Sequence, residues 1–486
     1  MNKLYYGDCR TIMRDHMKLA SVDLIYLDPP FNSNREYNAI YKDETGRPLP
    51  DQINAFCDRW EMSEERERAL RAMPVLMRET GIEDETVEFW RLWMNALRKT
   101  NPRLLAYLSY MVERLLLMKG ILKPTGSIYL HCDPTASHYI KVMMDGIFGH
   151  NNFRNEIIWC YKSGGSGKRW FSKKHDVILF YSKSPNYKFN LIKQKSYVAR
   201  SGNKKVTYYE DVKGTYTLVN QKDWWTDIGM MATSSKERLG FSTQKPLALI
   251  DRIIEAGSNK GDVVFDPFCG CATTIESAHR LDRQWIGIDI AIHAIKRVAK
   301  VRLQERMHLV EGEDFVIEGV PRNIEGARDL WTRDKYHFQK WAVEQVDGFV
   351  TTRQSGDGGV DGRIYFAMPE NDAHKRRALE SMAIEVKGGK NVGINVVREL
   401  RGVLDNDDAL LAGLVILEPL GERKERNFRK FMADAGDLDV LGMKYARMQM
   451  LTAEDILAGK RFHTPGAVGR VDQAVLSLSR SHVMLR

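Results

Sequence analysis

The sequence has no long hydrophobic run. Its longest, ALLAGLVIL at 409–417, has nine residues, well short of the roughly 18 to 20 needed to cross a bilayer. The first residues, MNKLYYGDC, lack the basic and then apolar pattern of a secretory signal. The six cysteines all lie between Cys9 and Cys271 and form no paired framework. We therefore expect a cytoplasmic protein that has no membrane partner.

The chain is basic, and the positive charge is unevenly distributed. With 73 Lys and Arg against 64 Asp and Glu, the net charge of the 486 residues is +9. Residues 161–209 contain twelve basic residues, ten interleaved aromatic residues and a single acid, Asp176. Basic side chains neutralise phosphates and aromatic rings stack on bases, so this segment is typical of a nucleic-acid surface. The alternative is a solvated lysine-rich face, although such a face more often mixes both signs of charge.

Apolar runs that fit strands alternate with helical patterns over the first 319 residues, which predicts an α/β fold with a mostly parallel sheet. The charged stretch 42–99 is expected to form an insertion over the site, with helical pieces. Breaker-rich residues 320–327 predict a linker, and a second α/β pattern follows at 328–486. The expected segments are strands at 22–27, 155–161, 175–181 and 284–290, and helices at 104–122 and 247–257.

Two loops at strand ends carry candidate functional residues. The loop from Asp266 to Ala272 follows the strand VVF and opens a helix, and Asp289 comes 23 residues after Asp266. This is the spacing of a carboxylate that binds ribose hydroxyls, although the full G-x-G-x-x-G pattern is missing. A tight turn without a ligand is the alternative. The second loop is LDPPFN, which contains Asp28, Pro29, Pro30 and Phe31.

In order along the chain, several strings resemble the β class of amino-group DNA methyltransferases, over residues 1 to about 310. They are GDC at 7–9, LDPPFN at 27–32, LKPTGSIYLHCD at 122–133, WWTDIG at 224–229, STQKP at 242–246 and DPFCGCATT at 266–274. The resemblance implies a permuted Rossmann-like sheet that binds S-adenosylmethionine. It also implies that residues 162–240 recognise the target DNA.

The resemblance also assigns residues to the cofactor. It implies a cofactor loop and a ribose-binding Asp289, with Asp8 near the adenine. Ala272 departs from the family, which often has glycine there, and an alanine with positive φ would be strained. The implied loop residues are Asp266, Pro267, Phe268, Gly270 and Thr273, and the residues implied at the methionine end are Gln244, Lys245 and Pro246.

The residue types of the second loop suit the chemistry of a base amine, which is a poor nucleophile because its lone pair is delocalised into the ring. Asp28 and the carbonyl of Pro29 can accept its two N–H bonds, and Pro30 stiffens the loop. The target base must leave the duplex, and Phe31 would stack on it. An aspartate that opens this loop resembles adenine N6 enzymes more than cytosine N4 enzymes, so cytosine stays the alternative.

The second domain has a Gly-rich turn that ends at Asp361, followed by strands and by the sequence EVK. Glu385 and Lys387 lie two residues apart and thus on one face of a strand. Taken alone, E-x-K is a common exposed pair. Together with the flanking helices, residues 330–420 resemble the Mrr-type branch of the PD-(D/E)xK endonucleases. The resemblance implies that Asp361 and Glu385 bind Mg²⁺ and that Lys387 orients the attacking water, with Glu344 as a further carboxylate.

The combined prediction is a single-chain restriction and modification enzyme acting on double-stranded DNA, associated with a prokaryotic nucleoid. The alternative keeps the methyltransferase and makes the second domain a non-catalytic DNA-binding module, and RNA is a weaker substrate option. No G-x-x-x-x-G-K-[ST] loop is present, which argues against translocation by this chain. A homodimer is one option that the sequence does not decide.

Overall fold

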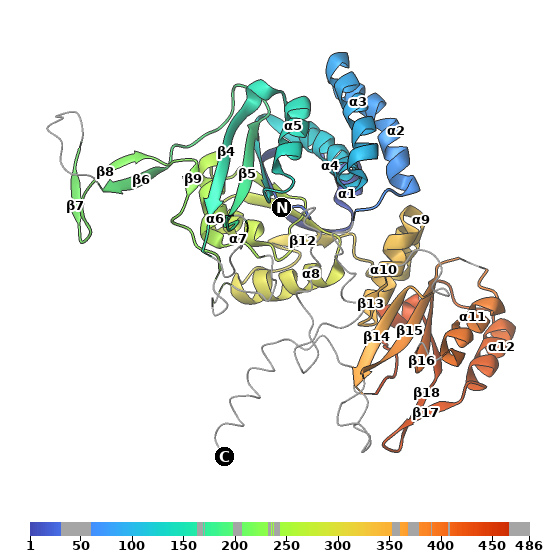
Figure 1. Ribbon diagram of the computed structural model, residues 1–486. Helices are drawn as coiled ribbons and strands as arrows, with labels where there is room; N and C mark the ends of the chain where they lie inside the picture. Colours follow the sequence, from blue (N-terminus) through green and yellow to red (C-terminus); the bar gives the residue numbers. More distant parts are fainter. Residues whose placement is uncertain are drawn as a thin grey trace. The chain divides into compact units, whose positions relative to one another are not determined.

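The computed structural model divides the described chain into two compact units, one ending at Glu318 and the other beginning at Gly319. Figure 1 shows their elements. Among the described residues, no helix is both long and apolar enough to cross a membrane. The described residues are 1–30, 60–162, 169, 171–197, 207–231, 235, 237, 244–351, 360–367, 379–389, 391–406 and 409–465.

A nine-stranded sheet forms the centre of the first unit. Its order is β12-β1-β11-β10-β2-β3-β5-β4-β9, and within it only β5 runs antiparallel to its neighbours. The mostly parallel α/β sheet is therefore as predicted. The strands are β12 (Phe315–Glu318), β1 (Asn2–Tyr6), β11 (Gln284–Asp289), β10 (Val263–Asp266), β2 (Val22–Leu27), β3 (Leu122–Cys132), β5 (His175–Ser182), β4 (Phe153–Cys160) and β9 (Trp224–Trp225).

Helices cover both faces of this sheet (Figure 1). On one face lie α6 (Leu247–Gly257), α7 (Thr273–Arg280) and α8 (Ile292–Arg297), which continues as a π-helix over Val298–Arg306. On the other face lie α1 (Cys9–His16), α4 (Pro102–Ile121) and α5 (Ser137–Phe148), followed by a 3₁₀ turn at His150–Asn152. Two features differ from the helix expected at 104–122. β3 already begins at Leu122, and α4 is buried on nearly all sides rather than along one face.

The predicted insertion over the site is wrong for its described part. Residues 60–99 belong to α2 (Glu64–Glu79) and α3 (Asp84–Thr100), which pack on the outer side of α4. Met77, Trp90 and Met94 are buried there and join the hydrophobic core. The charged residues of this stretch predict a peripheral segment, but its apolar residues are spaced so that each helix has a buried face. Residues 42–59 lie outside the described part.

A small three-stranded sheet extends from the first unit (Figure 1). It has the order β6-β8-β7 and is antiparallel. Its strands are β6 (Lys193–Tyr197), β8 (Gly214–Asn220) and β7 (Tyr209–Asp211). It belongs to the segment 162–240, of which residues 163–168, 170, 198–206, 232–234, 236 and 238–240 lie outside the description.

The second unit has a five-stranded sheet with the order β13-β14-β15-β16-β19, in which β15, β16 and β19 are parallel. The expected linker 320–327 is partly wrong, because α9 begins at Ile324 and Asn323 caps it by accepting the N–H of Gly326. The strands are β13 (Phe349–Val350), β14 (Gly362–Ala367), β15 (Leu379–Lys387), β16 (Leu411–Ile416) and β19 (Met448–Thr452), with the hairpin β17 (Asp437–Val440) and β18 (Met443–Ala446). The helices are α9 (Ile324–Arg333), α10 (Lys335–Gln345), α11 (Ile394–Asp405), α12 (Glu422–Ala433) and α13 (Ala453–Leu457).

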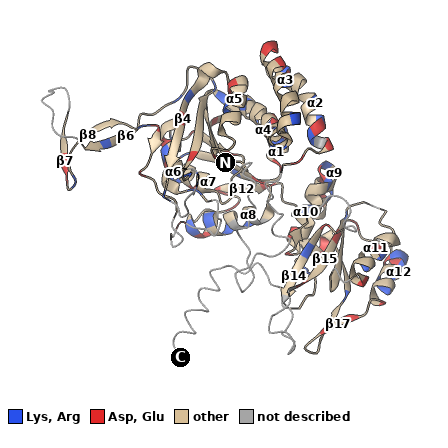
Figure 2. Cartoon of the chain, in the orientation of Figure 1, with Lys and Arg blue, Asp and Glu red and all other residues tan. Residues whose placement is uncertain are grey.

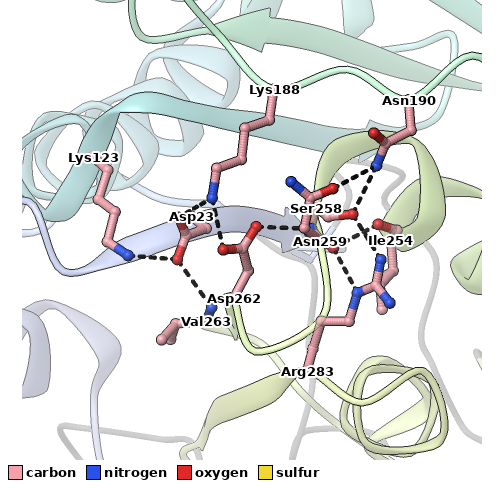
Figure 3. Close-up of polar contacts among 10 residues, drawn as sticks. All are labelled: Asp23, Lys123, Lys188, Asn190, Ile254, Ser258, Asn259, Asp262, Val263 and Arg283. Atoms are coloured by element: carbon pink, nitrogen blue, oxygen red, sulfur yellow. Dashed lines mark hydrogen bonds and ion pairs between the residues drawn. The ribbon is translucent and has the colours of Figure 1, made fainter.

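A buried carboxylate at the start of β2 joins the central strands at their amino ends (Figure 3). Asp23 is 1% exposed; it accepts the backbone N–H of Val263 at 3.0 Å and pairs with Lys123 at 2.7 Å and Lys188 at 2.9 Å. Lys188 also reaches Asp262 at 2.6 Å. These contacts fasten β2 to β10, and thereby set which loops meet at the opposite edge of the sheet.

We predict that Asp23→Asn destabilises the first unit by about 3 kcal/mol, because two lysines then lose a buried anionic partner. Burial raises the pKa of Asp23, but Lys123, the N–H of Val263 and Lys188 together lower it below its ordinary value. The folded state therefore gains stability from Asp23 above about pH 4 and loses it as pH falls. Urea unfolding should show the full deficit at pH 7 and a deficit that shrinks as the pH is lowered from about 4 through the lowered pKa of Asp23.

Asp282→Asn is the matched control, because Asp282 also pairs with a lysine, Lys260, at 2.7 Å, but both side chains are exposed. Exposed pairs contribute roughly 0 to 1 kcal/mol. Equal deficits in the two variants at pH 7 would refute the role assigned to Asp23.

Candidate active site

Four neighbouring strands end in aspartates or lead directly into them. In the sheet, β1, β11, β10 and β2 are adjacent and parallel, so their carboxyl ends lie at one edge. Asp289 and Asp266 end β11 and β10, and Asp8 and Asp28 follow β1 and β2. The two candidate loops, separated by more than two hundred residues, are thus brought to the same edge, as their placement after parallel strands requires.

The loop after β10 is shaped by its own carboxylates. Asp266 accepts the N–H of Phe268 at 3.0 Å, and Asp289 accepts the N–H groups of Gly270 at 2.9 Å and Ala291 at 2.7 Å. Burial raises the pKa of Asp266 to about 7, although Thr274 and the N–H of Phe268 oppose that rise. Gly270 has φ +48°, and the nearest atom to a Cβ built there is 3.9 Å away. The backbone at this glycine therefore borders open space.

Ala272 occupies the strained position expected from the sequence. It is fully buried in the left-handed region, with φ 58° and ψ 38°, and directly precedes α7. An alanine in this region costs roughly 1 to 2 kcal/mol relative to glycine. The N–H of Ala272 bonds to the carbonyl of Cys269 at 2.6 Å, which closes the turn. The alanine therefore adopts a left-handed turn that glycine would adopt without strain, at an energetic cost.

Asp8 is held by the protein itself. Its carboxylate caps α1 by accepting the N–H of Arg10 at 2.8 Å, and it pairs with the buried Arg114. Burial raises the pKa of Asp8, but Arg114 and Arg10 outweigh burial and lower it. The N–H of Gly7 bonds to the carbonyl of Asp289 at 3.0 Å, so the ends of β1 and β11 are tied together. The geometry gives Asp8 an anchoring role; its predicted contact with an adenine stays a prediction.

Asp28 has one occupied and one open oxygen. Its Oδ2 forms an ion pair with Lys245, and both side chains are less than one fifth exposed. Its Oδ1 is buried and has no hydrogen-bond partner in the described part of the chain. Pro29 is buried and Pro30 half-buried, and Phe31 lies outside the described residues. A buried carboxylate oxygen without a donor calls for an N–H or O–H from a ligand.

The segment implied to border the methionine end of the cofactor lies before α6. Gln244 is buried and donates to the carbonyl of Glu237 at 2.8 Å, and Pro246 precedes the first residue of the helix. Lys245 points to Asp28. Of these three residues, Lys245 thus contacts the loop that contains Asp28, and the sequence did not predict this contact.

Sequence reasoning also missed a buried polar chain beside Asp28. Asp176 on β5 hydrogen-bonds to His131 at 3.0 Å and to Tyr161 at 2.9 Å, and His131 to Tyr26 at 2.9 Å. The available signal was that Asp176 is the single acid in a strongly basic stretch.

The described part of the basic segment displays aromatic side chains. Tyr209 stacks on Tyr216 at 5.5 Å, and Tyr197 lies 5.7 Å from Tyr216, all on the small three-stranded sheet. Figure 2 shows basic residues on β6 of this sheet, and Lys195 lies 4.4 Å from the Tyr216 ring centroid. Exposed rings with interleaved lysines suit contact with a nucleic acid.

The second unit brings Asp361, Glu385 and Lys387 together. Asp361 accepts the N–H of Val386 at 2.7 Å, and Lys387 pairs with Oε1 of Glu385 at 2.7 Å. Glu385 is fully buried, and its Oε2 has no hydrogen-bond partner among the described residues. Burial raises the pKa of Glu385 to about 7 in spite of Lys387. The expected Glu344 is buried on α10.

No group of three potential metal-binding His, Cys, Asp or Glu side chains is found in the described part of the chain. Two carboxylates, one of them buried with an unpartnered oxygen, still fit Mg²⁺, which keeps several waters and often takes only one or two protein carboxylates. For the cofactor loop, the open backbone at Gly270 and the unpartnered Oδ1 of Asp28 fit a bound small molecule.

The chain resembles known DNA methyltransferases. It is 33% identical over 223 residues to the type II methyltransferase M.HpaI of Haemophilus parainfluenzae, covering 45% of this chain and 66% of that protein. It is 29% identical over 196 residues to the DNA adenine methyltransferase YhdJ of Escherichia coli K12, covering 39% of this chain and 65% of that protein. The matched segment is thus just under two thirds of either relative.

Among solved structures, the modification methylase TTHA0409 of Thermus thermophilus, complexed with S-adenosyl-L-methionine, is 16% identical. The match covers 65% of this chain and 99% of that one, with a TM-score of 0.36. The DNA methylase family, whose members act on N6 or N4 amino groups, matches residues 22–300, more than half of this chain. The chain belongs to the N6/N4 DNA methylase family.

Proposed function

We propose that the first unit transfers a methyl group from S-adenosylmethionine to the N6 amine of a flipped adenine in double-stranded DNA, and that the second unit is a Mg²⁺-dependent endonuclease. The observation that carries the first part is the unpartnered, buried Oδ1 of Asp28 at the edge shared with the loop from Asp266 to Thr273. Adenine is favoured over cytosine by the Asp-Pro-Pro opening and by the similarity to an adenine methyltransferase.

The residues that would hold the cofactor are those of the Asp266–Thr273 loop, including Pro267, with Asp289 at the ribose. When bound, S-adenosylmethionine supplies an electrophilic methyl group on a sulfonium. The open geometry of Gly270 supports this assignment, because a ligand can approach the backbone there without meeting a side chain.

The chain's contribution to the chemistry is orientation of the amine. Oδ1 of Asp28 accepts one amine N–H and the carbonyl of Pro29 accepts the other, which directs the nitrogen lone pair out of the ring plane. The ion pair with Lys245 leaves Oδ1 for this contact. Because neither proline has an N–H, the loop cannot continue the strand and stays fixed in place. Phe31 would stack on the flipped base.

In the second unit, Asp361 and Glu385 would hold Mg²⁺, which when bound polarises a scissile phosphate. Lys387 would orient the attacking water. Oε2 of the buried Glu385 has no hydrogen-bond partner among the described residues, which supports this assignment. A buried carboxylate costs free energy unless a cation or a proton compensates its charge.

Asp28→Ala is expected to lower methyl transfer to duplex DNA at least about a hundredfold, because the amine loses its orienting acceptor. Binding of S-adenosylmethionine, followed by calorimetry, should stay within a few fold of wild type. Transfer is measured with labelled cofactor. Asp15→Ala, on the exposed end of α1, is the control and should leave transfer unchanged. Full transfer by Asp28→Ala would reject the assignment.

Asp361→Ala is expected to abolish Mg²⁺-dependent DNA cleavage while methyl transfer persists. Because the pKa of Glu385 is about 7, and its proton must leave before a metal binds, cleavage by the wild type should rise as pH increases from 6 to 8. The assay uses unmethylated and methylated duplexes, since either could be the substrate.

Asp439→Ala, on the β17–β18 hairpin of the same unit, is the control for that experiment and should cleave normally. If no duplex is cut by the wild type at any pH with Mg²⁺, the second unit is a DNA-binding module instead.

A further inference from the structure

The buried polar chain beside Asp28 crosses four adjacent strands. Tyr26 lies on β2, His131 on β3, Asp176 on β5 and Tyr161 directly after β4, and these strands are neighbours in the sheet. The contacts are Tyr26 Oη to His131 Nδ1 at 2.9 Å, His131 Nε2 to Asp176 Oδ2 at 3.0 Å, and Tyr161 Oη to Asp176 Oδ1 at 2.9 Å. The rings of Trp159 and His131 form a T-shaped pair, with their centroids 5.8 Å apart.

The charge of Asp176 sets the direction of the hydrogen bond between Asp176 and His131. Asp176 is anionic, because its hydrogen bonds with His131 and Tyr161 and the charge of Lys245 outweigh the effect of burial and lower its pKa. A carboxylate only accepts, so Nε2 of His131 carries a hydrogen and donates to Asp176. Burial raises the pKa of Tyr26, helped by the charge of Asp28, so its phenol keeps its proton where it hydrogen-bonds with Nδ1 of His131.

Lys245 connects this chain to Asp28. It forms the ion pair with Oδ2 of Asp28, and its charge also acts on Asp176. Both oxygens of Asp176 are already occupied by His131 and Tyr161, which fixes the carboxylate in place. The strand register places both carboxylates at the same edge of the sheet, because Leu27 pairs with Leu130 on β3 and Val177 pairs with Cys132 on β3. Lys245 therefore pairs with Asp28 at an edge where Asp176 supplies a second negative charge.

We infer that Asp176, fixed by His131 and Tyr161, is a positioning residue for methyl transfer: it holds Lys245 so that Lys245 occupies Oδ2 of Asp28 and leaves Oδ1 for the target amine. None of the recognised motif positions includes Asp176. The inference rests on the proposed methyltransferase function. It explains why the basic segment retains one acid, since that acid lies in the active site rather than on the DNA surface.

The test is a comparison of Asp176→Asn with wild type in steady-state methyl transfer. Without the fixed carboxylate Lys245 is less well positioned, so kcat should fall about tenfold or more. Because Asp176 does not itself contact the substrate, the Kd values for S-adenosylmethionine and DNA should stay within twofold of wild type. A purely structural residue would lower stability or binding instead, and thermal melting checks this. Tyr161→Phe removes one hydrogen bond to Asp176 and should lower kcat in the same direction by a smaller factor.

Asp145→Asn is the matched control. Asp145 also accepts a tyrosine O–H, from Tyr181 at 2.8 Å, and pairs with a lysine, Lys141, at 2.7 Å, in the same unit. Tyr181 belongs to β5, the strand that carries Asp176. Asp145→Asn should leave kcat unchanged.

A double-mutant cycle with Lys245→Met shows whether Asp176 acts through the lysine. If it does, Asp176→Asn adds no further loss in kcat once Lys245 has been replaced. The inference would be overturned if the fold losses in kcat of the two single variants multiplied in the double variant. It would also be overturned if kcat stayed within twofold of wild type in both Asp176→Asn and Tyr161→Phe. Absence of methyl transfer by the wild type would instead overturn the proposed function, so the two failures are distinct.

Discussion

The pairing of β2 with β10 is the constraint on which the site depends. Only two residue pairs, Val264 with Leu24 and Phe265 with Ile25, define the register of this central contact. Asp23 reinforces this pairing from the amino ends of the strands, where its carboxylate accepts the N–H of Val263 and forms ion pairs with two lysines (Figure 3). Since a strand displaced by one residue would turn every side chain to the opposite face, this buried anion protects the register that brings the loop at Asp28 and the loop from Asp266 to Thr273 to one edge of the sheet.

Bringing strand ends together also gathers like charges, and the protein handles each carboxylate differently. Asp8 is neutralised by Arg114, and Asp289 by backbone N–H groups. Asp266 has few compensating partners, and burial therefore raises its pKa to about 7. Asp28 pairs with Lys245 through one oxygen, and its other oxygen has no hydrogen-bond partner in the described part of the chain. Contacts thus reduce charge repulsion at Asp8, Asp289 and Asp28, whereas Asp266 is compensated through its raised pKa.

Much of the first unit could be predicted from local patterns, because its buried parallel strands are short apolar runs and its helix at 247–257 has a clear apolar face. The loops could be placed at one edge because parallel strands share their carboxyl ends. The packing of α2 and α3 on α4 could not, since a charged surface hides the buried stripe. Neither could the Asp176 chain, whose members come from four strands and meet only through the sheet order.

A carboxylate beside a lysine recurs in both units, and the comparison shows which contacts a sequence can reveal. Glu385 and Lys387 are two residues apart on one strand, so their pairing follows from the period of the strand alone. Asp28 and Lys245 are 217 residues apart and meet only once the fold is complete. In both pairs the lysine offsets part of the cost of a desolvated carboxylate, and the other oxygen has no hydrogen-bond partner among the residues that the structure describes. An oxygen that is already desolvated interacts strongly with an incoming donor or cation, because little solvent must be removed at that moment.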